Sequence, residues 1–496
     1  MYTQHLVIIK LVLLLLFAAI IPVQTKATYR RIKLMMVAIL GTISILSIAN
    51  YINVREVGTI FYDFGNWDRF IGVQFRIDEF SSLFAIYISL LATLILVYSF
   101  KDIENLVSRK QSIKYYTIVL VMIFSVFGLL FTNDLFNMFV FMEILSITSC
   151  AIVSIVHTKK NLLSSFKYLM INTIGSLSIL KGIAYIYMVS GHLNISKINE
   201  SMGIMWEASQ TNIMIALGFI MIGVSIKVAA FPMHIWLPDA YESAPASSAA
   251  FLSALANKVY VVVIFKIIYN MIGREILIEL GLMDITMYFA AAGIIIGSLF
   301  AIAQKNIKRM LAYSSVAQVG YILLGLALNT PLGNKAALFH MISHGLLKTA
   351  LFMSVGAIFY QCNREKTRQL DGLVTRSPIA LAVFAIGALG MIGIPGTSGF
   401  MGKLYLSIAV LQAGRPILLV AIIVSSFLSA MYFVPIIISA FVKEDIDHPK
   451  RIEDKILPRT LVYPMVIIII LSAIIGFYPQ LITVIAENAI NSLMIN

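Results

Sequence analysis

A few ionisable residues lie inside otherwise hydrophobic stretches of this chain. Glu143 is the acid well inside such a stretch, and Lys227 and Lys258 lie on either side of a proline-containing link. Charged side chains at membrane depth usually face a protein interior and mark an ion path. A buried lysine releases its proton more readily than an exposed one, whereas a nearby carboxylate holds the proton in place. We therefore expect Glu143 and Lys227 to pair, and their separation to free a proton for Lys258. The alternative is that Glu143 only links neighbouring helices by hydrogen bonds.

A second group of candidates recurs every four residues within one hydrophobic segment, at His340, His344 and Lys348. On a helix this spacing places the three side chains along one face. Histidine titrates near neutral pH and can relay protons. Two alternatives remain for the histidines: structural hydrogen bonds to backbone carbonyls, and a zinc site, for which no third ligand or catalytic glutamate is apparent. The predicted ion path comprises Glu143, Lys227, Lys258, His340, His344, Lys348 and Lys403.

Secondary candidates flank this path. Lys181 is another potential partner of Glu143, or it extends its long side chain to the membrane surface. The same surface-reaching role is expected of Lys10 and Lys266. His234 is expected to cap the proline-containing link, and Asp239 lies in that link.

Long apolar segments must position these residues. Hydrophobic residues make up 60% of the 496 positions, and a membrane span needs roughly 20 apolar residues. About fourteen segments qualify on this criterion. They are 6–22, 34–52, 79–100, 115–131, 134–156, 166–190, 211–231, 246–270, 285–303, 310–328, 336–360, the interrupted 378–411, 417–442 and 461–482. The short connections leave no room for a soluble domain, so we predict an all-α polytopic membrane protein.

The loops between these segments alternate between rich and poor in Lys and Arg. The rich loops are 26–33, 101–114, 159–167, 305–309, 364–376 and 443–459. The positive-inside rule makes them cytoplasmic and places both termini outside the cell membrane. The net charge of +13 is shared between loops and spans, so it does not indicate nucleic-acid binding. Two isolated cysteines indicate neither a disulfide framework nor a thiolate metal cluster, and we expect no metal and no cofactor.

Two spans are interrupted just before or after a lysine. Pro232 follows Lys227, and the glycine-rich stretch 393–399 precedes Lys403. Matching interruptions in two halves of a membrane protein point to an internal repeat with its ion site at the breaks.

Four segments carry a resemblance to a known superfamily. They are N-D-L-F-N-M-F-V-F-M-E (133–143), A-A-F-P-M-H-I-W-L-P-D-A (229–240), L-A-Y-S-S-V-A-Q-V-G-Y (311–321) and A-L-F-H-M-I-S-H-G-L-L-K (337–348). These motifs resemble the antiporter-like subunits of Mrp-type cation/proton antiporters, respiratory complex I and group 4 membrane-bound hydrogenases. The chain departs from the family pattern at 244–250, which lacks a second proline, and at Tyr260, where a glycine is frequent.

The resemblance implies fourteen helices, with two inverted five-helix repeats and broken helices 7 and 12. The implied parts are 1–110, the repeats 111–270 and 271–445, and a loop with a last helix at 446–496. It also implies a proton- or cation-translocating subunit that works beside other, partly homologous membrane subunits and lipid, moving H⁺ and, in some relatives, Na⁺. The chain length and Lys403 favour the Mrp D-type subunit, with a proton-pumping subunit of a hydrogenase or complex I as the alternative.

Two other classes of protein compete with this interpretation. A redox enzyme that itself binds quinone or a metal centre is disfavoured, because cysteine clusters, haem-attachment motifs and glycine-rich nucleotide motifs are missing from the sequence. A scaffold with inactive charged residues remains open. We expect no catalytic chemistry of the chain's own, and the sequence leaves open whether its complex is redox-driven.

Overall fold

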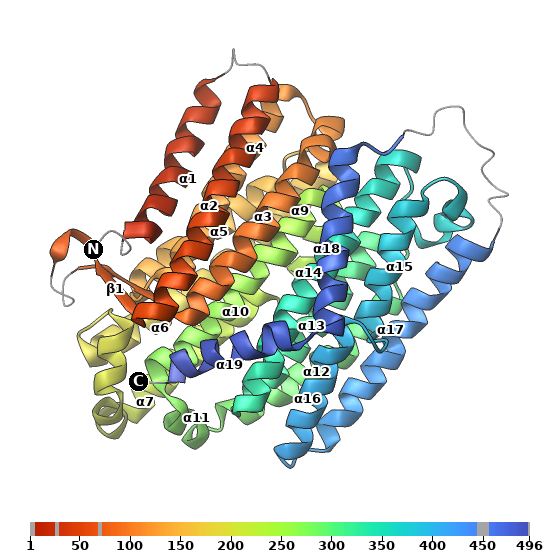
Figure 1. The fold of residues 1–496 in the computed structure, drawn as a ribbon. Coiled ribbons are helices and arrows are strands. Elements are labelled where there is room, and N and C mark those ends of the chain that lie inside the picture. The colour runs from red at the N-terminus through yellow and green to blue at the C-terminus, as the bar shows by residue number, and fades with distance from the viewer. Residues whose placement is uncertain (1–4, 25–28, 68–71, 444–455, 495–496) are drawn as a thin grey trace.

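The computed structural model describes residues 5–24, 29–67, 72–443 and 456–494, which form a bundle of mostly parallel and antiparallel helices (Figure 1). The first half contains α1 (Leu6–Val23), α2 (Tyr29–Val57), α3 (Glu79–Leu106), α4 (Arg109–Phe131), α5 (Leu135–Val153), α6 (Lys159–Ser190), α7 (Ile195–Val228), α8 (Trp236–Ser243), α9 (Ala246–Phe251) and α10 (Asn257–Phe265). The second half contains α11 (Arg274–Glu279), α12 (Leu282–Ile302), α13 (Ile307–Ala327), α14 (Pro331–Cys362), α15 (Pro378–Ile392), α16 (Ser398–Gln412), α17 (Ile417–Val442), α18 (Arg459–Phe477) and α19 (Gln480–Met494).

Thirteen helical stretches of the described chain are long and apolar enough to cross a membrane. The remaining predicted span, 378–411, consists of the shorter helices α15 and α16 on either side of a break. The prediction of an all-α polytopic membrane protein is confirmed, apart from a small two-stranded sheet. That sheet pairs β1 (Ile60–Asp63) antiparallel with β2 (Gln74–Ile77), in the connection between the predicted spans 34–52 and 79–100.

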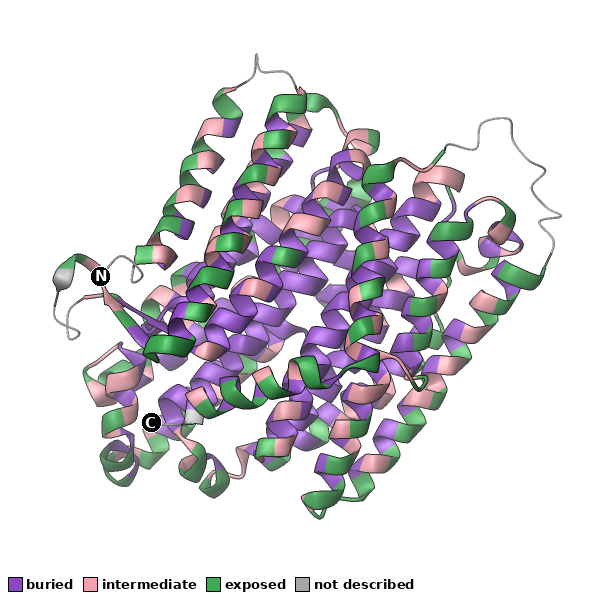
Figure 2. Cartoon of the chain, in the orientation of Figure 1, coloured by how far each residue is buried: buried purple, intermediate pink, exposed green. Residues whose placement is uncertain are grey.

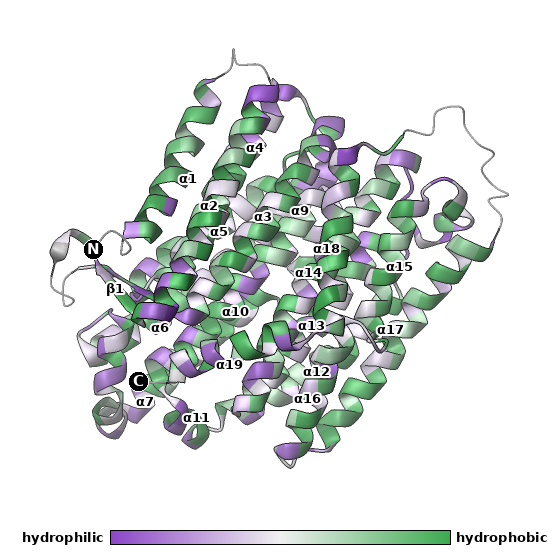
Figure 3. Cartoon of the chain, viewed as in Figure 1, coloured by the Kyte–Doolittle hydropathy of each residue, from purple (hydrophilic) through white to green (hydrophobic). Residues whose placement is uncertain are grey.

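Three elements form the centre of the bundle. In the span 246–272, every residue of the most apolar 18-residue stretch is buried. In α13 and in α14, 94% of the residues of the corresponding stretch are buried. The outer helices expose much of their surface (Figure 2), and that exposed surface is largely hydrophobic (Figure 3). This distribution fits a protein surrounded by lipid, in which polar groups gather inside rather than outside.

Alternate loops gather at opposite ends of the bundle. At one end, Thr367 N bonds Lys305 O at 2.9 Å, and Lys160 pairs with Glu242 at 2.6 Å. At the other end, Asn133 N bonds Gln74 O at 2.9 Å. We name these the charge-rich and charge-poor ends. The loops predicted to be rich in Lys and Arg lie at the first, except that positions 26–28 and 444–455 are outside the described residues.

The span 246–272 contains two wide, π-helical turns that sequence periodicity does not reveal. They are Leu252–Ala256 and Lys266–Ile272, on either side of α10. In the first, Asn257 N bonds Leu252 O five residues back. Such turns occur frequently at functional sites, and these two flank Lys258.

The C-terminal helix α19 was also missed. It lies crosswise over the bundle and packs against α3 and α14 (Figure 1). Arg76 Nη2 donates to Ser492 O at 3.2 Å, and Lys335 pairs with Glu487. The predicted last span therefore ends with α18, and the chain turns along the charge-poor end.

The break in α7 is held open by specific hydrogen bonds. Ala229 ends the helix with a left-handed backbone conformation (φ +56°). The indole of Trp236 donates to Ile226 O at 2.8 Å, and Asn257 Nδ2 donates to Val228 O at 2.7 Å. Helix ends leave carbonyls without partners, so Trp236 and Asn257 stabilise the interruption. The His234 ring lies against Phe231, Phe300 and Tyr313, and its side chain has a hydrogen bond with the backbone of Pro232 in the link. The expectation that His234 caps this link stays a prediction.

The break between α15 and α16 depends on a close backbone approach, which generates our first prediction. A Cβ added to Gly399 would lie 1.9 Å from Gly390 O, so the Gly399→Ala protein should be destabilised by at least the ~1–3 kcal/mol typical of overpacking. The control is Gly41→Ala in α2, where nothing lies within 4 Å and alanine favours the helix. Thermal melting in detergent should show a lower midpoint for Gly399→Ala only. Equal midpoints for both variants would contradict the tight packing.

Candidate functional site

Glu143 and Lys227 form the predicted pair. Lys227 Nζ lies 3.4 Å from Glu143 Oε1 and donates to Ser146 Oγ at 2.6 Å. The Lys227 side chain is fully buried, whereas that of Glu143 is 29% exposed and also accepts a bond from Ser176 Oγ on α6. The pair therefore combines an enclosed ammonium with a carboxylate that reaches the surface of the isolated chain.

Two residues connect this pair with the neighbourhood of Lys258. Tyr260 OH lies 3.3 Å from Ser146 Oγ, and the Tyr260 ring faces Lys227 Nζ at 5.9 Å. Asn257 bonds the end of α7, and its Oδ1 lies 3.4 Å from Lys258 Nζ. The tyrosine that departs from the family pattern thus belongs to the polar chain that leaves Lys227.

Lys258 contacts the histidines of α14. Its Nζ lies 2.8 Å from His344 Nδ1, and the contact is fully buried. The rings of His344 and His340 are parallel, with centroids 6.4 Å apart. His340 Nε2 lies 2.8 Å from Gln318 Oε1 on α13. The i, i+4 spacing therefore does line two histidines along one face, as the sequence predicts.

Lys403 occupies the second break. Its Nζ donates to Met391 O at 3.0 Å, to Ile392 O at 2.9 Å and to Ser426 Oγ at 3.0 Å. The first two acceptors are carbonyls at the C-terminal end of α15, where the helix dipole favours a cation. Tyr321 connects this lysine to the histidines, since its ring lies 5.1 Å from Lys403 Nζ and 5.3 Å from the His340 ring.

Lys348 branches away from this line. Its Nζ donates to Leu311 O at 2.6 Å and to Ser314 Oγ, both on α13. The lysine is fully buried, one turn beyond His344.

Several buried polar atoms around the histidines have no protein partner within the described residues. They are Tyr87 OH, Gln318 Nε2, His340 Nδ1, Ser343 Oγ and His344 Nε2. Leaving a buried donor or acceptor unpaired costs about 1–3 kcal/mol each, and buried water usually satisfies such groups. Their concentration around Lys258 and His340 is what a hydrated proton path requires.

The secondary candidates lie away from this path. Lys181 is exposed on α6, where its Nζ faces the Phe219 ring at 4.3 Å and not Glu143. Asp239 lies at the charge-rich end and pairs with Arg309 at 2.7 Å and Lys167 at 3.0 Å. Burial alone raises the pKa of the Asp239 carboxyl, but the hydrogen bonds from Lys167 and Arg309 outweigh it and hold the pKa below its ordinary value. The stability these pairs add is complete above the ordinary pKa and is lost as the pH falls below it.

Two lysines were placed wrongly by sequence reasoning. Lys266 does not reach the membrane surface; it is buried and donates to Leu129 O at 3.2 Å and Thr132 O at 3.0 Å at the end of α4. Lys10 is also buried, with its Nζ over the Phe131 ring at 4.8 Å. In both cases the distance from the span's end suggested snorkelling, but the side chain faces a neighbouring helix.

Other polar participants had no sequence signal of their own. Ser146, Ser176, Gln318 and Asn257 are ordinary residue types in apolar segments, and only their contacts with polar or charged groups single them out. Within the described residues, no three His, Cys, Asp or Glu side chains are grouped so that they could hold a metal ion.

The fold and this buried line of lysines and histidines define a class of polytopic membrane protein. Residues 132–429 match the family model described as NADH:quinone oxidoreductase/Mrp antiporter, TM, and the chain belongs to this family. The resemblance seen in the sequence motifs is therefore confirmed.

Similar relatives include both NADH-quinone oxidoreductase subunits and Na⁺/H⁺ antiporter subunits. The chain is 33% identical over 382 residues to NADH-quinone oxidoreductase subunit N of Desulforudis audaxviator, in an alignment that covers 77% of this chain and 75% of the relative. It is 29% identical over 431 residues to the D-type subunit of the Na⁺/H⁺ antiporter of Bacillus subtilis, with coverage of 87% and 85%.

Two solved structures are also similar. A chain of the Mrp complex from Dietzia sp. superposes with a TM-score of 0.90 at 25% identity, covering 100% of this chain and 98% of the other. A chain of a membrane-bound sulfane sulfur reductase, an archaeal respiratory membrane complex, has a TM-score of 0.90 at 27% identity, covering 98% and 97%.

The Glu143–Lys227 pair generates the second prediction. Lys227→Ala leaves the Glu143 carboxylate without its ammonium partner. Breaking a fully buried pair costs about 3–5 kcal/mol of folding stability. We expect a smaller loss of stability here, because the Glu143 side chain is 29% exposed. Lys227→Arg keeps the charge but cannot release a proton near neutral pH. Melting in detergent should show that Lys227→Ala is destabilised and Lys227→Arg is close to wild type.

Transport separates the same two variants from the wild type. Both should lose proton movement, the alanine variant through missing charge and the arginine variant through a proton it never releases. Normal proton movement by Lys227→Arg would exclude deprotonation of Lys227 from the mechanism.

Proposed function

We propose that this chain is a proton-translocating subunit of a membrane complex, similar to the D-type subunit of Mrp antiporters, and that protons move along the buried line from Glu143 to Lys403. The observation that carries the proposal is the 2.8 Å contact between Lys258 and His344, because it joins two proton-exchanging groups in a fully buried place. The order along the line is Glu143, Lys227, Lys258, His344, His340 and Lys403, with Lys348 as a side branch.

The pair at Glu143 supplies the switch. While Glu143 and Lys227 are together, the carboxylate stabilises the ammonium and Lys227 keeps its proton. When they separate, the desolvated ammonium is disfavoured, and its proton passes through hydroxyls or water toward Lys258. The contacts of Ser146, Tyr260 and Asn257 supply polar groups for this step.

The second half of the line ends at the other break. His344 and His340 pass the proton along one face of α14, and Lys403 receives it beside Tyr321. The two breaks support a division into N-terminal helices (1–110), two inverted repeats (111–270 and 271–445) and a C-terminal part (446–496). We place the charge-rich end in the cytoplasm and both termini outside.

Partners follow from the relatives. The similar solved chains belong to an Mrp complex and to a respiratory membrane complex, so we propose that this chain also works beside other membrane subunits. The name of the Bacillus relative contains Na⁺ beside H⁺, and we propose that this chain takes part in Na⁺/H⁺ exchange. The alternative is a redox-driven pump, which the identity to the NADH-quinone oxidoreductase relative supports. A Na⁺ gradient alone drives proton movement if the complex is a Na⁺/H⁺ exchanger, and does not if the complex is a redox-driven pump.

The third prediction tests the switch. Glu143→Gln should abolish coupled proton movement in membrane vesicles, because the neutral amide no longer holds the proton on Lys227, while the amount of assembled protein stays normal. Glu143→Asp keeps the charge on a shorter side chain and should retain partial activity.

The control is Glu207→Gln, since Glu207 is an exposed acid on α7. Acridine-orange fluorescence should report wild-type proton movement for this variant. If Glu143→Gln also moved protons at the wild-type rate, the pair would be structural only.

A further inference from the structure

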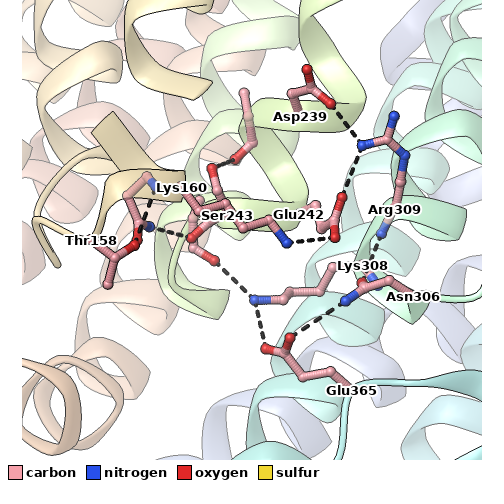
Figure 4. A network of polar contacts seen from close by, with 12 residues as sticks. Thr158, Lys160, Asp239, Glu242, Ser243, Asn306, Lys308, Arg309 and Glu365 are labelled. Atoms are coloured by element: carbon pink, nitrogen blue, oxygen red, sulfur yellow. Dashed lines mark hydrogen bonds and ion pairs between the residues drawn. The ribbon is translucent and has the colours of Figure 1, made fainter. Parts of the chain in front are cut away.

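A cavity of about 120 Å³ opens at the charge-rich end, away from the line of lysines and histidines. It lies among α3, α8, α9, the start of α13 and the end of α14, and the neighbouring charged network is shown in Figure 4. This volume accommodates several water molecules. Its charged lining residues are Asp102, Lys308 and Glu365.

An ion pair lies at the cavity wall. Lys308 Nζ is 3.0 Å from Glu365 Oε1 and donates to Ala244 O at 3.2 Å (Figure 4). Glu365 is also held by Asn306 Nδ2 at 3.4 Å. The Glu365 side chain is 30% exposed, against 11% for Lys308, so Glu365 is the part of this pair that meets the solution.

A buried carboxylate lies deeper in the same cavity. Asp102 is 7% exposed, and its Oδ2 accepts a bond from Ser247 N at 2.8 Å. Hydroxyl groups continue inward from there. Tyr115 OH donates to Ser247 Oγ at 3.3 Å, and Ser248 Oγ donates to Tyr115 OH at 3.4 Å.

The helix that carries Asp102 also reaches the central lysine. Three polar residues share one face of α3 within about 60° of rotation: Tyr87, then Tyr98 eleven residues later, then Asp102 four residues after that. Tyr98 OH donates to Met353 O on α14 at 2.7 Å. A Cβ added to Gly345 would lie 1.6 Å from Tyr87 OH and 3.6 Å from Lys258 Cε. Tyr87 OH has no partner within the described residues, so it presents an unpaired hydroxyl beside Lys258.

We propose that this cavity is the port through which protons enter the chain from the charge-rich end, and that Asp102 is the carboxylate that takes them up. A hydronium ion in the cavity gives its proton to the Asp102 carboxylate, which becomes a neutral acid. Glu365 meanwhile keeps the Lys308 ammonium at the wall. The proton then leaves toward the hydroxyls of Tyr115 and Ser248 and onward to the hydroxyl of Tyr87, and Asp102 returns to its charged form.

This inference rests on the proposed proton translocation and adds a residue outside the line that begins at Glu143. The fourth prediction separates uptake from structure. Asp102→Asn keeps an oxygen that can accept the Ser247 N–H, because the asparagine side-chain carbonyl is also an acceptor, but it cannot take up a proton. Full-length protein in vesicles that contain its whole complex should lose proton movement in Asp102→Asn, with unchanged assembly. Asp102→Glu should restore part of it.

The matched control is Glu104→Gln, two residues along the same helix, where the acid pairs with Lys33 outside the cavity. It should move protons at the wild-type rate. Wild-type activity in Asp102→Asn would overturn the port, provided that Glu143→Gln is inactive in the same assay. Vesicles whose wild-type complex moves no protons would overturn the proposed function and the port together.

A chemical test covers the case in which Asp102→Asn fails to assemble. In a background with Cys150 and Cys362 replaced by Ser, Leu106→Cys places a thiol in the cavity lining, and Lys110→Cys places one on the exposed start of α4. A membrane-impermeant maleimide applied from the charge-rich side should stop proton movement in Leu106→Cys only. Labelled Leu106→Cys protein with undiminished proton movement would overturn the port.

Discussion

Every ammonium buried in the core of this bundle needs a source of negative potential, and for two of the described lysines carbonyls at helix ends supply it. Lys266 is held by carbonyls at the end of α4, and Lys403 by carbonyls at the end of α15. Such carbonyls carry partial rather than full charges, so they stabilise the cation without fixing its proton. Lys227 differs, because it alone among the buried lysines described here has a carboxylate within ion-pair distance at membrane depth. The breaks in α7 and between α15 and α16 therefore help to decide which groups stabilise the charge on Lys227 and Lys403.

The two breaks satisfy their freed carbonyls in different ways. At the end of α7, neutral donors from Trp236 and Asn257 occupy the carbonyls, which leaves Lys227 free for Glu143. At the end of α15, the lysine itself occupies them. The two breaks thus hold their lysines in different ways. One lysine pairs with a partly exposed side-chain carboxylate, and the other is held by backbone carbonyls.

The sequence predicted the features that depend on residue type and on position along a helix. The spans, both interruptions, the Glu143–Lys227 pair and the shared face of His340 and His344 could all be anticipated from hydrophobicity and spacing. Beyond the missed helix α19 and the small sheet, the errors concern the direction in which a side chain points. Lys10 and Lys266 looked like surface-reaching residues because they lie off the middle of their spans, but tertiary packing turned them inward. The contacts of Tyr260 and Asn257 depend on the path of the π-helical span, which no single-sequence periodicity shows.

The wide turn at Leu252–Ala256 has a geometric consequence for this span. It closes with a bond from Asn257 N to Leu252 O, so it holds one residue more than an α-helical turn. A helical wheel drawn straight through 246–272 would misplace Lys258 by about 100°, the rotation that one residue contributes. The extra residue changes the rotational register between the two parts of the span. It lets the start of the span stay docked beside Asp102 while Lys258 faces His344, two alignments that an uninterrupted α-helix of this length would not offer together.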